Sequence, residues 1–451
     1  MHDFTQGRIA RPLTVFAIPI ILGNLFMQTY NLVNAAVVGS YLGKEALSAV
    51  GAAYPIVFML MSLVIGIASG GTVLVAQYVG ARDSQNVRRS VDTVYVFVFF
   101  ASIVVTAVGI WLTPTIYSVT NLPADVMPYA VAYLRVYLLG TIFTFVFNTI
   151  SALLRGMGDS RTPLFFLIGS NVLNLVLSLL FICVFRWGVV SSAWASVISQ
   201  AVACVAFYLF LWRKKSDAVM HSGKVHWSAP IFRAMLKIGL PTGLQQSFVA
   251  VGQVALSAIV NGFGTVMVAA YSAAVRIESI ATIPTMNFSQ ALSTFVGQNV
   301  GAGKMDRVDK AFRKTMIITT LVSVAIAVVL VIFGRPIMRI FSTEQAVVDE
   351  GYRYLTVCGP MYFLFAIMFT FTGLFRGAGY TLVPMLTSLV SLWVIRVPLA
   401  SWFSAHIGTL GIWIAIPAGW LVGALLSIVY FKMGRWRDKR VTDTVFKDIE
   451  Q

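Results

Sequence analysis

Long apolar runs separated by short polar segments extend along the whole chain. A helix needs about 20 apolar residues to cross the hydrocarbon core of a bilayer, and most of these runs are at least that long. The pattern therefore predicts an all-α polytopic membrane protein with twelve transmembrane helices. The expected spans are residues 12–36, 46–79, 88–115, 126–154, 161–185, 189–213, 231–259, 264–300, 308–339, 345–377, 381–405 and 409–433.

Several of the expected spans contain an internal proline, among them Pro19, Pro55, Pro241, Pro284 and Pro360. Proline removes one helical hydrogen bond, so each of these helices is expected to bend where neighbouring groups or water satisfy the freed carbonyl. The first apolar run, Leu13 to Val38, is too long for the core of a signal peptide and lacks a small-residue cleavage site, so we expect it to remain as a helix.

The chain repeats itself at an offset of 221 residues. The segment VAQYVGARDSQNVRRS at 75–90 returns as VGQNVGAGKMDRVDKA at 296–311, and LLRGMG returns as LFRGAG, with Arg155 matching Arg376. Two matched blocks at one offset indicate a duplication, which predicts two pseudo-symmetric six-helix lobes. The expected parts are an N-terminal lobe over 1–213, a cytoplasmic linker over 214–230, a C-terminal lobe over 231–433 and a basic cytoplasmic tail over 434–451.

Composition supports a membrane protein and excludes several other classes. Of the 451 residues 58% are hydrophobic and 11% are charged, with a mean hydropathy of +0.83, whereas a soluble domain carries about 25% charge. The three cysteines lie in apolar runs, so neither a disulfide framework nor a metal knuckle is indicated. The formal charge of +16 is spread over the loops, and we therefore expect no nucleic-acid partner and no cofactor.

The basic residues instead predict the orientation of the chain. If the N-terminus is placed inside, the cytoplasmic segments hold 25 lysines and arginines and the outer segments hold four. Cytoplasmic loops of membrane proteins carry this excess of positive charge. Both termini are therefore expected to be cytoplasmic, in a multi-pass protein of the plasma or inner membrane.

Two carboxylates come near the bilayer interior in the predicted topology, and only one of them is near its midplane. Asp92 is expected at the cytoplasmic interface, whereas Glu278 lies about halfway along the eighth span. A charge at that depth costs about 2.5–3.5 kcal/mol and usually marks an ion or substrate pathway. The alternative is a structural pair with an arginine. Arg396 is at similar depth, whereas Arg276, two residues away on the same helix, cannot face Glu278.

The first half has no such acid, because Val57 stands at the position that matches Glu278. It has stripes of neutral polar residues instead, and the seventh span carries three glutamines. These groups either make hydrogen bonds between helices, worth about 0.6–2 kcal/mol per contact, or line a cavity. They are Gln28, Tyr30, Asn31 and Asn34 in the first span, Asn171, Asn174 and Ser178 in the fifth, and Gln245, Gln246 and Gln253 in the seventh.

Other patterns argue against an enzyme. No strand precedes the RGMG and RGAG segments, so they are expected to form tight turns with an arginine at the lipid headgroups rather than phosphate-binding loops. The four histidines are far apart in sequence, which gives no metal-ligand spacing. No pattern typical of a nucleophilic or acid–base catalytic site is present.

The order of these segments resembles the multidrug and toxic compound extrusion (MATE) transporters over nearly the whole chain. The resemblance implies two six-helix lobes around a central cleft and export of organic cations against an inward flow of protons or sodium. It rests on IPIILGNLFMQTYNLVNAAVVGSYLG and ALSAVGAAYPI, then LVAQYVGARD and LLRGMGDSRTP, and in the second half AAVRIESIATIP, LSTFVGQNVGAGK and LFRGAG.

The chain departs from that family at two positions. Members commonly carry aspartate where Asn34 stands, and many carry a second where Ser178 stands; these acids are linked to ion coupling in the N-terminal lobe. Neither residue here can ionise. Either coupling rests on Glu278, or Asn34 replaces an aspartate. The expected coupling group therefore comprises Glu278, Arg276, Asn34, Asn174 and Ser178, and the expected substrate cleft includes Arg396 together with the neutral polar residues named above.

The sequence thus predicts an ion-coupled antiporter that works by alternating access, as two matched halves allow. Its expected partners are small organic cations and the lipid bilayer, and it is expected to act as a monomer. Two alternatives stay open. A lipid-linked precursor flippase would need a strongly basic cleft, for which Arg276 and Arg396 are candidates. A non-transporting membrane enzyme or receptor would not require the duplication.

Overall fold

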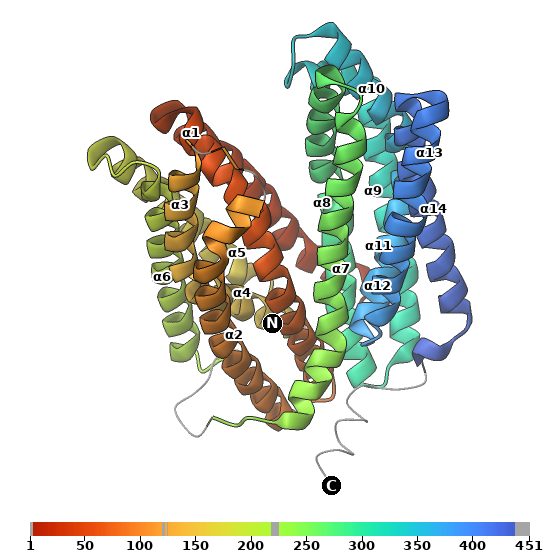
Figure 1. The fold of residues 1–451 in the computed structure, drawn as a ribbon. Helices are drawn as coiled ribbons and strands as arrows, with labels where there is room; N and C mark the ends of the chain where they lie inside the picture. Colours follow the sequence, from red (N-terminus) through yellow and green to blue (C-terminus); the bar gives the residue numbers. More distant parts are fainter. Residues whose placement is uncertain (1–2, 120–121, 124, 218–224, 438–451) are drawn as a thin grey trace. The chain divides into compact units, whose positions relative to one another are not determined.

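A computed structural model describes residues 3–119, 122–123, 125–217 and 225–437, which contain helices and no strands (Figure 1). The repeated apolar runs set the lengths of these helices. Their bounds are α1 Ala10–Gly80, α2 Ser84–Val119, α3 Met127–Leu139, α4 Thr141–Gly156, α5 Arg161–Leu179, η1 Leu180–Val184, α6 Val190–Arg213, α7 Ala229–Asn261, α8 Thr265–Gly301, α9 Met305–Arg339, α10 Gln345–Cys358, η2 Gly359–Met361, α11 Tyr362–Gly377, α12 Leu382–Leu389, η3 Val390–Arg396, α13 Val397–Ile407, α14 Thr409–Lys432 and η4 Arg435–Arg437.

Within the described residues, the prediction of twelve spans is confirmed. Eleven segments are long and apolar enough to cross a membrane, and α3 with α4 makes a twelfth, bent by 51°. The long helix α1 contributes two of the eleven, Ala10–Gly43 and Ser48–Gly80, because Gly43 has a φ of 83° that only glycine adopts readily. The first apolar run is helical in this structure, as expected.

Breaks in the helices only partly follow the prolines. Pro360 lies in the 3-10 turn η2 between α10 and α11, which agrees with the predicted bend. Pro19, Pro55, Pro241 and Pro284 lie within helices that continue through them. Two further breaks lie at glycines. Gly43 has a positive φ, which glycine adopts at low cost, and a Cβ added to Gly140 would lie 2.6 Å from Val197 Cγ2.

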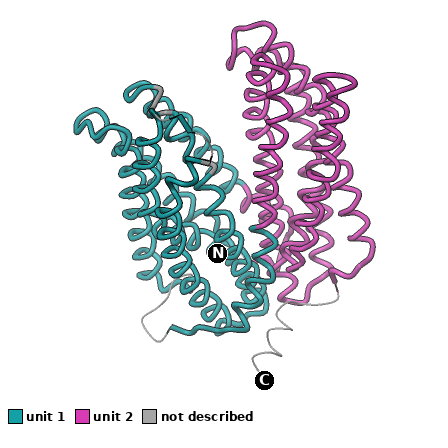
Figure 2. Tube along the Cα trace, viewed as in Figure 1, with its two compact units in different colours: residues 1–2, 18–243 teal, residues 3–17, 244–451 magenta. Residues whose placement is uncertain are grey.

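The described chain forms two compact units (Figure 2). Unit 1 comprises residues 18–243, and unit 2 comprises residues 3–17 and 244–437. These units do not coincide with the expected lobes 1–213 and 231–433, because each takes the beginning of a helix that continues in the other. The first residues of α1 belong to unit 2, and the first residues of α7 belong to unit 1.

Close glycine packing explains why the beginning of α7 belongs to unit 1. Gly66 and Gly70 on α1 face Gly239 and Gly243 on α7, so both helices carry small residues four positions apart. A Cβ added to Gly66 would lie 2.3 Å from the Cα of Gly243, and one added to Gly70 would lie 2.3 Å from the Met235 carbonyl oxygen. Small residues at this spacing let two membrane helices approach until their backbones touch.

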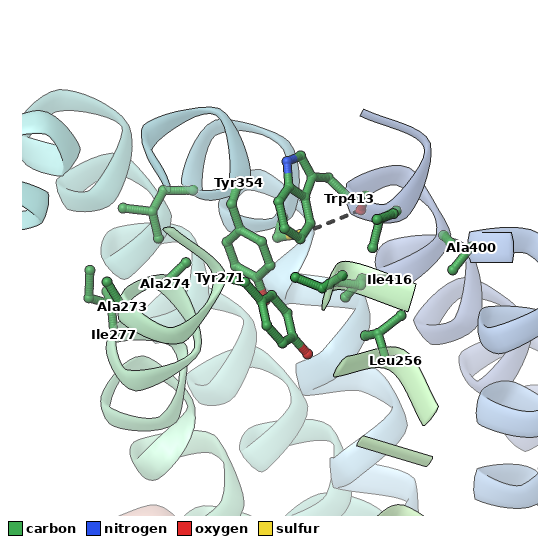
Figure 3. Packing of buried hydrophobic residues seen from close by; sticks show 14 of the residues in the cluster. Leu256, Tyr271, Ala273, Ala274, Ile277, Tyr354, Ala400, Trp413 and Ile416 are labelled. Carbon is green, nitrogen blue, oxygen red and sulfur yellow. Dashed lines mark hydrogen bonds between the residues drawn. The ribbon is translucent and has the colours of Figure 1, made fainter. Parts of the chain in front are cut away.

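Unit 2 has a similar close approach and an aromatic core. A Cβ on Gly373 of α11 would lie 2.3 Å from the Ser289 carbonyl oxygen of α8. Above this contact, Tyr271, Tyr354 and Trp413 pack among aliphatic side chains (Figure 3). All three aromatic residues are buried, so α8, α10 and α14 are held together by large rings that each bury much apolar area.

The N-terminal segment is fastened to unit 2 by the turn between α8 and α9. Phe4 is buried, with its ring 5.2 Å from that of Phe16 and 5.4 Å from that of Phe295. Its backbone N–H donates to Gln298 Oε1 (3.2 Å), and its carbonyl accepts a hydrogen bond from Arg307 Nη2 (3.0 Å). These contacts assign the segment to unit 2, although α1 continues into unit 1.

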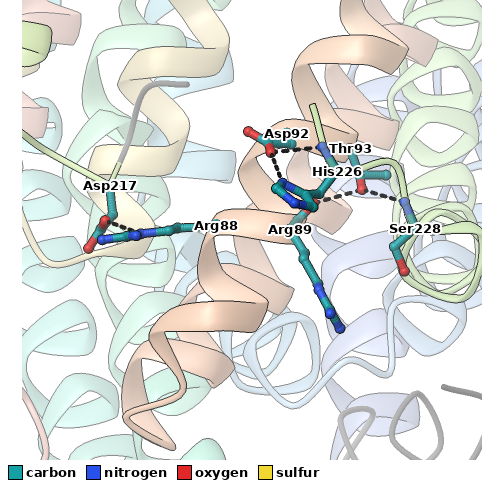
Figure 4. A network of polar contacts seen from close by, with 7 residues as sticks. All are labelled: Arg88, Arg89, Asp92, Thr93, Asp217, His226 and Ser228. Carbon is teal, nitrogen blue, oxygen red and sulfur yellow. Dashed lines mark hydrogen bonds and ion pairs between the residues drawn. The ribbon is translucent and has the colours of Figure 1, made fainter. Parts of the chain in front are cut away.

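The end of the linker is fastened to unit 1 by residues of α2 (Figure 4). The backbone N–H of His226 donates to Asp92 Oδ2 (3.1 Å), and that of Ser228 donates to Thr93 Oγ1 (3.3 Å). At the repeat offset, His226 matches Thr5, so matching segments are fastened in the two halves, although the residues that fasten them differ. Asp92 therefore has a structural partner in the linker.

Candidate functional site

Glu278 lies on α8 and is held by a residue of α10. The Tyr354 hydroxyl donates a hydrogen bond to Glu278 Oε2, and the Tyr354 side chain is completely buried. The other side-chain hydrogen bond near this turn, from Thr282 Oγ1 (2.9 Å), goes to the Glu278 backbone carbonyl. Tyr354 is thus the hydrogen-bond donor to the Glu278 carboxylate among the described residues.

Arg396 is the arginine of this site, and Arg276 is not. Arg396 is 7% exposed and ends the π-helix η3, a rare local geometry that often occurs at functional sites. It is close enough to interact electrostatically with Glu278, but the described residues show no direct ion pair between them. Its Nε is buried and has no hydrogen-bond partner among the described residues. Arg276 is exposed, and nothing in the described chain pairs it with Glu278.

Trp413 of α14 contacts three residues of α10, namely Glu350, Tyr354 and Cys358. The Trp413 indole N–H donates to Glu350 Oε1 (3.0 Å), and Glu350 forms an ion pair with Arg353 (3.6 Å). The Tyr354 ring lies edge-on to Trp413, with 4.9 Å between centroids. The buried Cys358 donates through Sγ to the Trp413 carbonyl oxygen (3.5 Å).

The sequence analysis missed Glu350, Tyr354, Cys358 and Trp413 as members of this site. A signal for three of them is present, because Glu350, Tyr354 and Cys358 are spaced four residues apart. Residues at that spacing share one face of a helix. Trp413 has no comparable signal, since an apolar aromatic residue in a transmembrane run is expected everywhere.

Unit 1 holds a neutral polar cluster centred on Asn174. Asn174 Oδ1 accepts hydrogen bonds from the Tyr30 hydroxyl (2.5 Å) and from Ser178 Oγ (3.2 Å). Its Nδ2 donates to Ser196 Oγ (3.0 Å) and to Ser199 Oγ (3.2 Å). An amide has two acceptor and two donor positions, so the Asn174 side chain is fully satisfied. The structure thus joins Tyr30, Asn174 and Ser178 and adds two serines of α6 that the sequence analysis missed.

The other polar residues expected in unit 1 are not part of this cluster. Asn34 Oδ1 and Asn171 Nδ2 are both buried atoms with no hydrogen-bond partner among the described residues. Gln28 is half-buried and Asn31 is exposed. Asn34 Oδ1 is therefore a buried acceptor that no described donor reaches, and Asn171 Nδ2 is a buried donor in the same condition.

The three glutamines of α7 have different surroundings. Gln245 is buried, donates to Ser388 Oγ (2.7 Å) and accepts from Arg376 Nη2 (3.5 Å). Gln253 Oε1 accepts from the Tyr271 hydroxyl (3.4 Å), whereas Gln246 is exposed. Gln245 therefore connects three helical segments of unit 2. Arg376, expected at the lipid headgroups, is half-buried and takes part in this connection.

The two units thus offer different chemistry. The cluster in unit 1 contains amides and hydroxyls, which cannot change charge near neutral pH. The site in unit 2 contains a carboxylate and an arginine, so it can gain or release a proton or a cation. Across the described residues, no group of histidine, cysteine, aspartate and glutamate side chains could hold a metal ion.

Comparison with known proteins identifies the family. The family model MatE matches residues 19–180 and again residues 241–402, two segments that begin 222 residues apart. The chain belongs to the MatE family. It is a multi-pass membrane transporter and not an enzyme, and the repeat in its sequence is the duplication that the family model matches twice.

The relatives and solved structures agree over nearly the whole chain. The chain is 32% identical to "Probable multidrug resistance protein YpnP" of Bacillus subtilis, over 97% of this chain and 98% of the relative. It is 27% identical to "Probable multidrug resistance protein NorM" of Thermotoga maritima, over 96% and 94%. An outward-facing MATE transporter structure superposes with a TM-score of 0.90 at 22% identity, over 97% and 98% of the two chains. The MATE fold is therefore that of this chain.

Proposed function

We propose that this transporter exports organic cations and drugs in exchange for protons or sodium ions that move inward, and that it does so as a monomer by alternating access. Three observations support the proposal. Relatives over nearly the full length are named multidrug resistance proteins. The chain is built from two matched halves, a plan that many alternating-access transporters share. One ionisable site lies within the helices of unit 2.

The proposal of ion coupling rests on Glu278. A carboxylate inside a membrane span is costly and is kept where it has a function. Glu278 has one neutral hydrogen-bond donor and no direct ion pair in the described chain, so no fixed charge neutralises it permanently. A membrane potential supplies about 2.3 kcal/mol per charge per 100 mV, which allows a concentration ratio of about fifty for one-for-one exchange.

The flippase alternative has less support. It requires several cationic groups for a pyrophosphate, and of the two candidate arginines only Arg396 is buried. That arginine already interacts electrostatically with Glu278. A single buried arginine next to a carboxylate suits a cation or proton better than a highly anionic substrate.

Transport into proteoliposomes tests the proposal. Purified protein is reconstituted, and uptake of a labelled organic cation is followed with a proton gradient, a sodium gradient or neither. We expect one of the two gradients to drive accumulation and the other to have no effect. Equal uptake under all three conditions would exclude coupling, and movement of a lipid-linked pyrophosphate without cation transport would favour the flippase.

The orientation has its own test. We propose that both termini and the linker are cytoplasmic, because the basic residues favour that side by 25 to four. Ser222 lies outside the described residues but within the linker, and a Ser222→Cys variant provides a labelling site. An impermeant thiol reagent should label it in inverted vesicles and not in intact cells; the opposite pattern would reverse the orientation.

A further inference from the structure

We propose that Tyr354 is a positioning residue for the coupling carboxylate: its hydroxyl holds Glu278 in place in both protonation states and stabilises the charged form. This inference rests on the proposed coupling role of Glu278. Tyr354 touches Glu278 and acts on transport only through it, so its effect must appear in how transport responds to pH.

The first argument is the geometry of the contact. Tyr354 of α10 donates its hydroxyl to Glu278 Oε2 of α8, and no other side chain in the described residues donates to that carboxylate. Because the Tyr354 side chain is completely buried, water does not replace its hydroxyl easily. A hydrogen bond to the charged form of an acid stabilises that form.

The second argument is the chemistry of the hydroxyl. A tyrosine hydroxyl can donate to an ionised carboxylate and can accept from a protonated one, whereas an arginine can only donate. A carboxylate in a direct ion pair with Arg396 would be strongly favoured in its charged form and would suit a structural role. The Tyr354 hydroxyl offers a partner that remains useful after Glu278 has been protonated.

The third argument is that the Tyr354 ring is itself fixed. It lies 4.9 Å from the Trp413 ring at 79° and 6.3 Å from the Tyr271 ring at 68° (Figure 3). Edge-to-face pairs of this kind are favourable. The Trp413 indole N–H is anchored on Glu350 Oε1 (3.0 Å), one helical turn before Tyr354 on α10. The orientation of the hydroxyl is thus set by packing on two sides and by a buried polar anchor.

The charged and titratable groups around Glu278 come from four elements. Arg396 comes from η3, Cys358 and Tyr354 from α10, Tyr362 from α11 and Tyr271 from α8 itself. Cys358, Tyr362 and Tyr271 make no hydrogen bond to the Glu278 carboxylate in the described chain. Removal of the Tyr354 hydroxyl therefore leaves the carboxylate with no hydrogen-bond donor among the described side chains.

The test is the variant Tyr354→Phe, which keeps the ring and removes the hydroxyl. Its matched control is Tyr352→Phe on the same helix, which loses a hydrogen bond to the Val331 carbonyl (3.1 Å) away from Glu278. Gradient-driven transport of a labelled organic cation is measured from pH 5 to 9. We expect the midpoint for Tyr354→Phe to move up by about one to two pH units, because a hydrogen bond to a charged group is lost. The control curve should coincide with that of the unmodified protein.

A second variant and a second measurement keep the test decisive. Trp413→Phe retains an aromatic ring but loses the anchor on Glu350, so it should shift the curve in the same direction by less. Modification of Glu278 by a hydrophobic carbodiimide, followed by mass spectrometry in detergent, reports protonation without transport. The midpoint of that reaction should shift with Tyr354→Phe as well.

The outcomes separate this inference from the proposed function. If Glu278→Gln abolishes coupling and Tyr354→Phe leaves both midpoints unchanged, the positioning role is excluded and the coupling role stands. If the carbodiimide midpoint shifts while Glu278→Gln still couples, Tyr354 controls Glu278 but Glu278 does not couple transport. An equal shift in the Tyr352→Phe control would attribute the effect to α10 packing and would overturn the inference.

Discussion

The two halves of this transporter repeat one sequence pattern, but their buried polar side chains differ in how many hydrogen-bond partners they have. In unit 1, Asn174 satisfies all four of its hydrogen-bonding positions with hydroxyl groups of Tyr30 and three serines. In unit 2, Glu278 has one hydroxyl donor, and a nearby arginine does not pair with it directly. A fully satisfied neutral network holds helices in place, whereas a sparsely satisfied charge responds to its surroundings.

The two units also differ in the residue that attaches the segment before α1 or before α7. The N-terminal segment meets unit 2 through Arg307, whose guanidinium donates to three backbone carbonyls of residues 4–7. The linker meets unit 1 through Asp92, a carboxylate that accepts from the backbone N–H of His226. At the repeat offset Asp92 matches Arg313 and Arg307 matches Asn86, so the two halves fasten these segments with residues at different positions and of opposite charge.

The largest expected effect concerns the charge that only unit 2 has. Glu278→Gln keeps the shape of the side chain and removes its ability to ionise. We expect it to remove gradient-driven accumulation, a loss of up to about fifty-fold at 100 mV, without unfolding the protein. Proteoliposome uptake measures the first effect and thermal unfolding in detergent measures the second. Glu344→Gln changes an exposed carboxylate at the start of α10 and is the control; retained accumulation in Glu278→Gln would make Glu278 a structural residue.

The next substitution gives unit 1 an ionisable side chain, as unit 2 already has. Asn34→Asp places an ionisable group where Asn34 Oδ1 is buried and without a partner. We expect the transport-versus-pH curve to gain a step or become steeper, because a second group then titrates during the cycle. Asn34→Ala should weaken packing and substrate binding without changing the shape of the curve. Curves of the same shape for both variants would exclude a dormant coupling position.

A smaller effect is expected from the neutral cluster itself. Asn174→Ala leaves the hydroxyls of Tyr30 and Ser178 without their acceptor, so we expect a loss of about 1–3 kcal/mol in the free energy of unfolding. Thermal unfolding in detergent measures this loss. Asn31→Ala, at an exposed position, should stay within about 0.5 kcal/mol. If Asn174→Ala instead changed the pH dependence of transport and spared stability, unit 1 would have a coupling role.

The smallest effects compare the two fastenings. Arg307→Ala removes three bonds to the N-terminal segment, and we expect faster proteolysis of that segment and a loss of about 1 kcal/mol in stability. Asp92→Ala removes one hydrogen bond to the linker, from the backbone N–H of His226 on unit 1 (3.1 Å), and should cost less, about 0.5 kcal/mol. Limited proteolysis and thermal unfolding give both values. Equal effects would mean that the two fastenings are equally strong.

Sequence patterns predicted the spans and the duplication because apolar length and internal repetition are properties of the sequence itself. The position of Glu278 about halfway along the eighth span was predicted from the same apolar length, and the structure places this residue in α8. A break between residues 36 and 46 was predicted, but its exact place at Gly43 was not, because a glycine in a positive-φ conformation looks like any other glycine in an apolar run. The Tyr354 contact depends on how α8 and α10 pack, and no residue spacing within one helix encodes that.

The exchange of helix beginnings between the units also orders events during synthesis. Phe4 leaves the ribosome first, but its partner Arg307 follows 303 residues later. At about 5–20 residues per second, the N-terminal segment waits about 15–60 seconds before it can bind. Unit 1 is likewise incomplete until residues 229–243 of α7 have emerged. A split of the chain at residue 213 would give two fragments, each carrying a segment that the other needs, so the halves should reach their native state only when they are produced together.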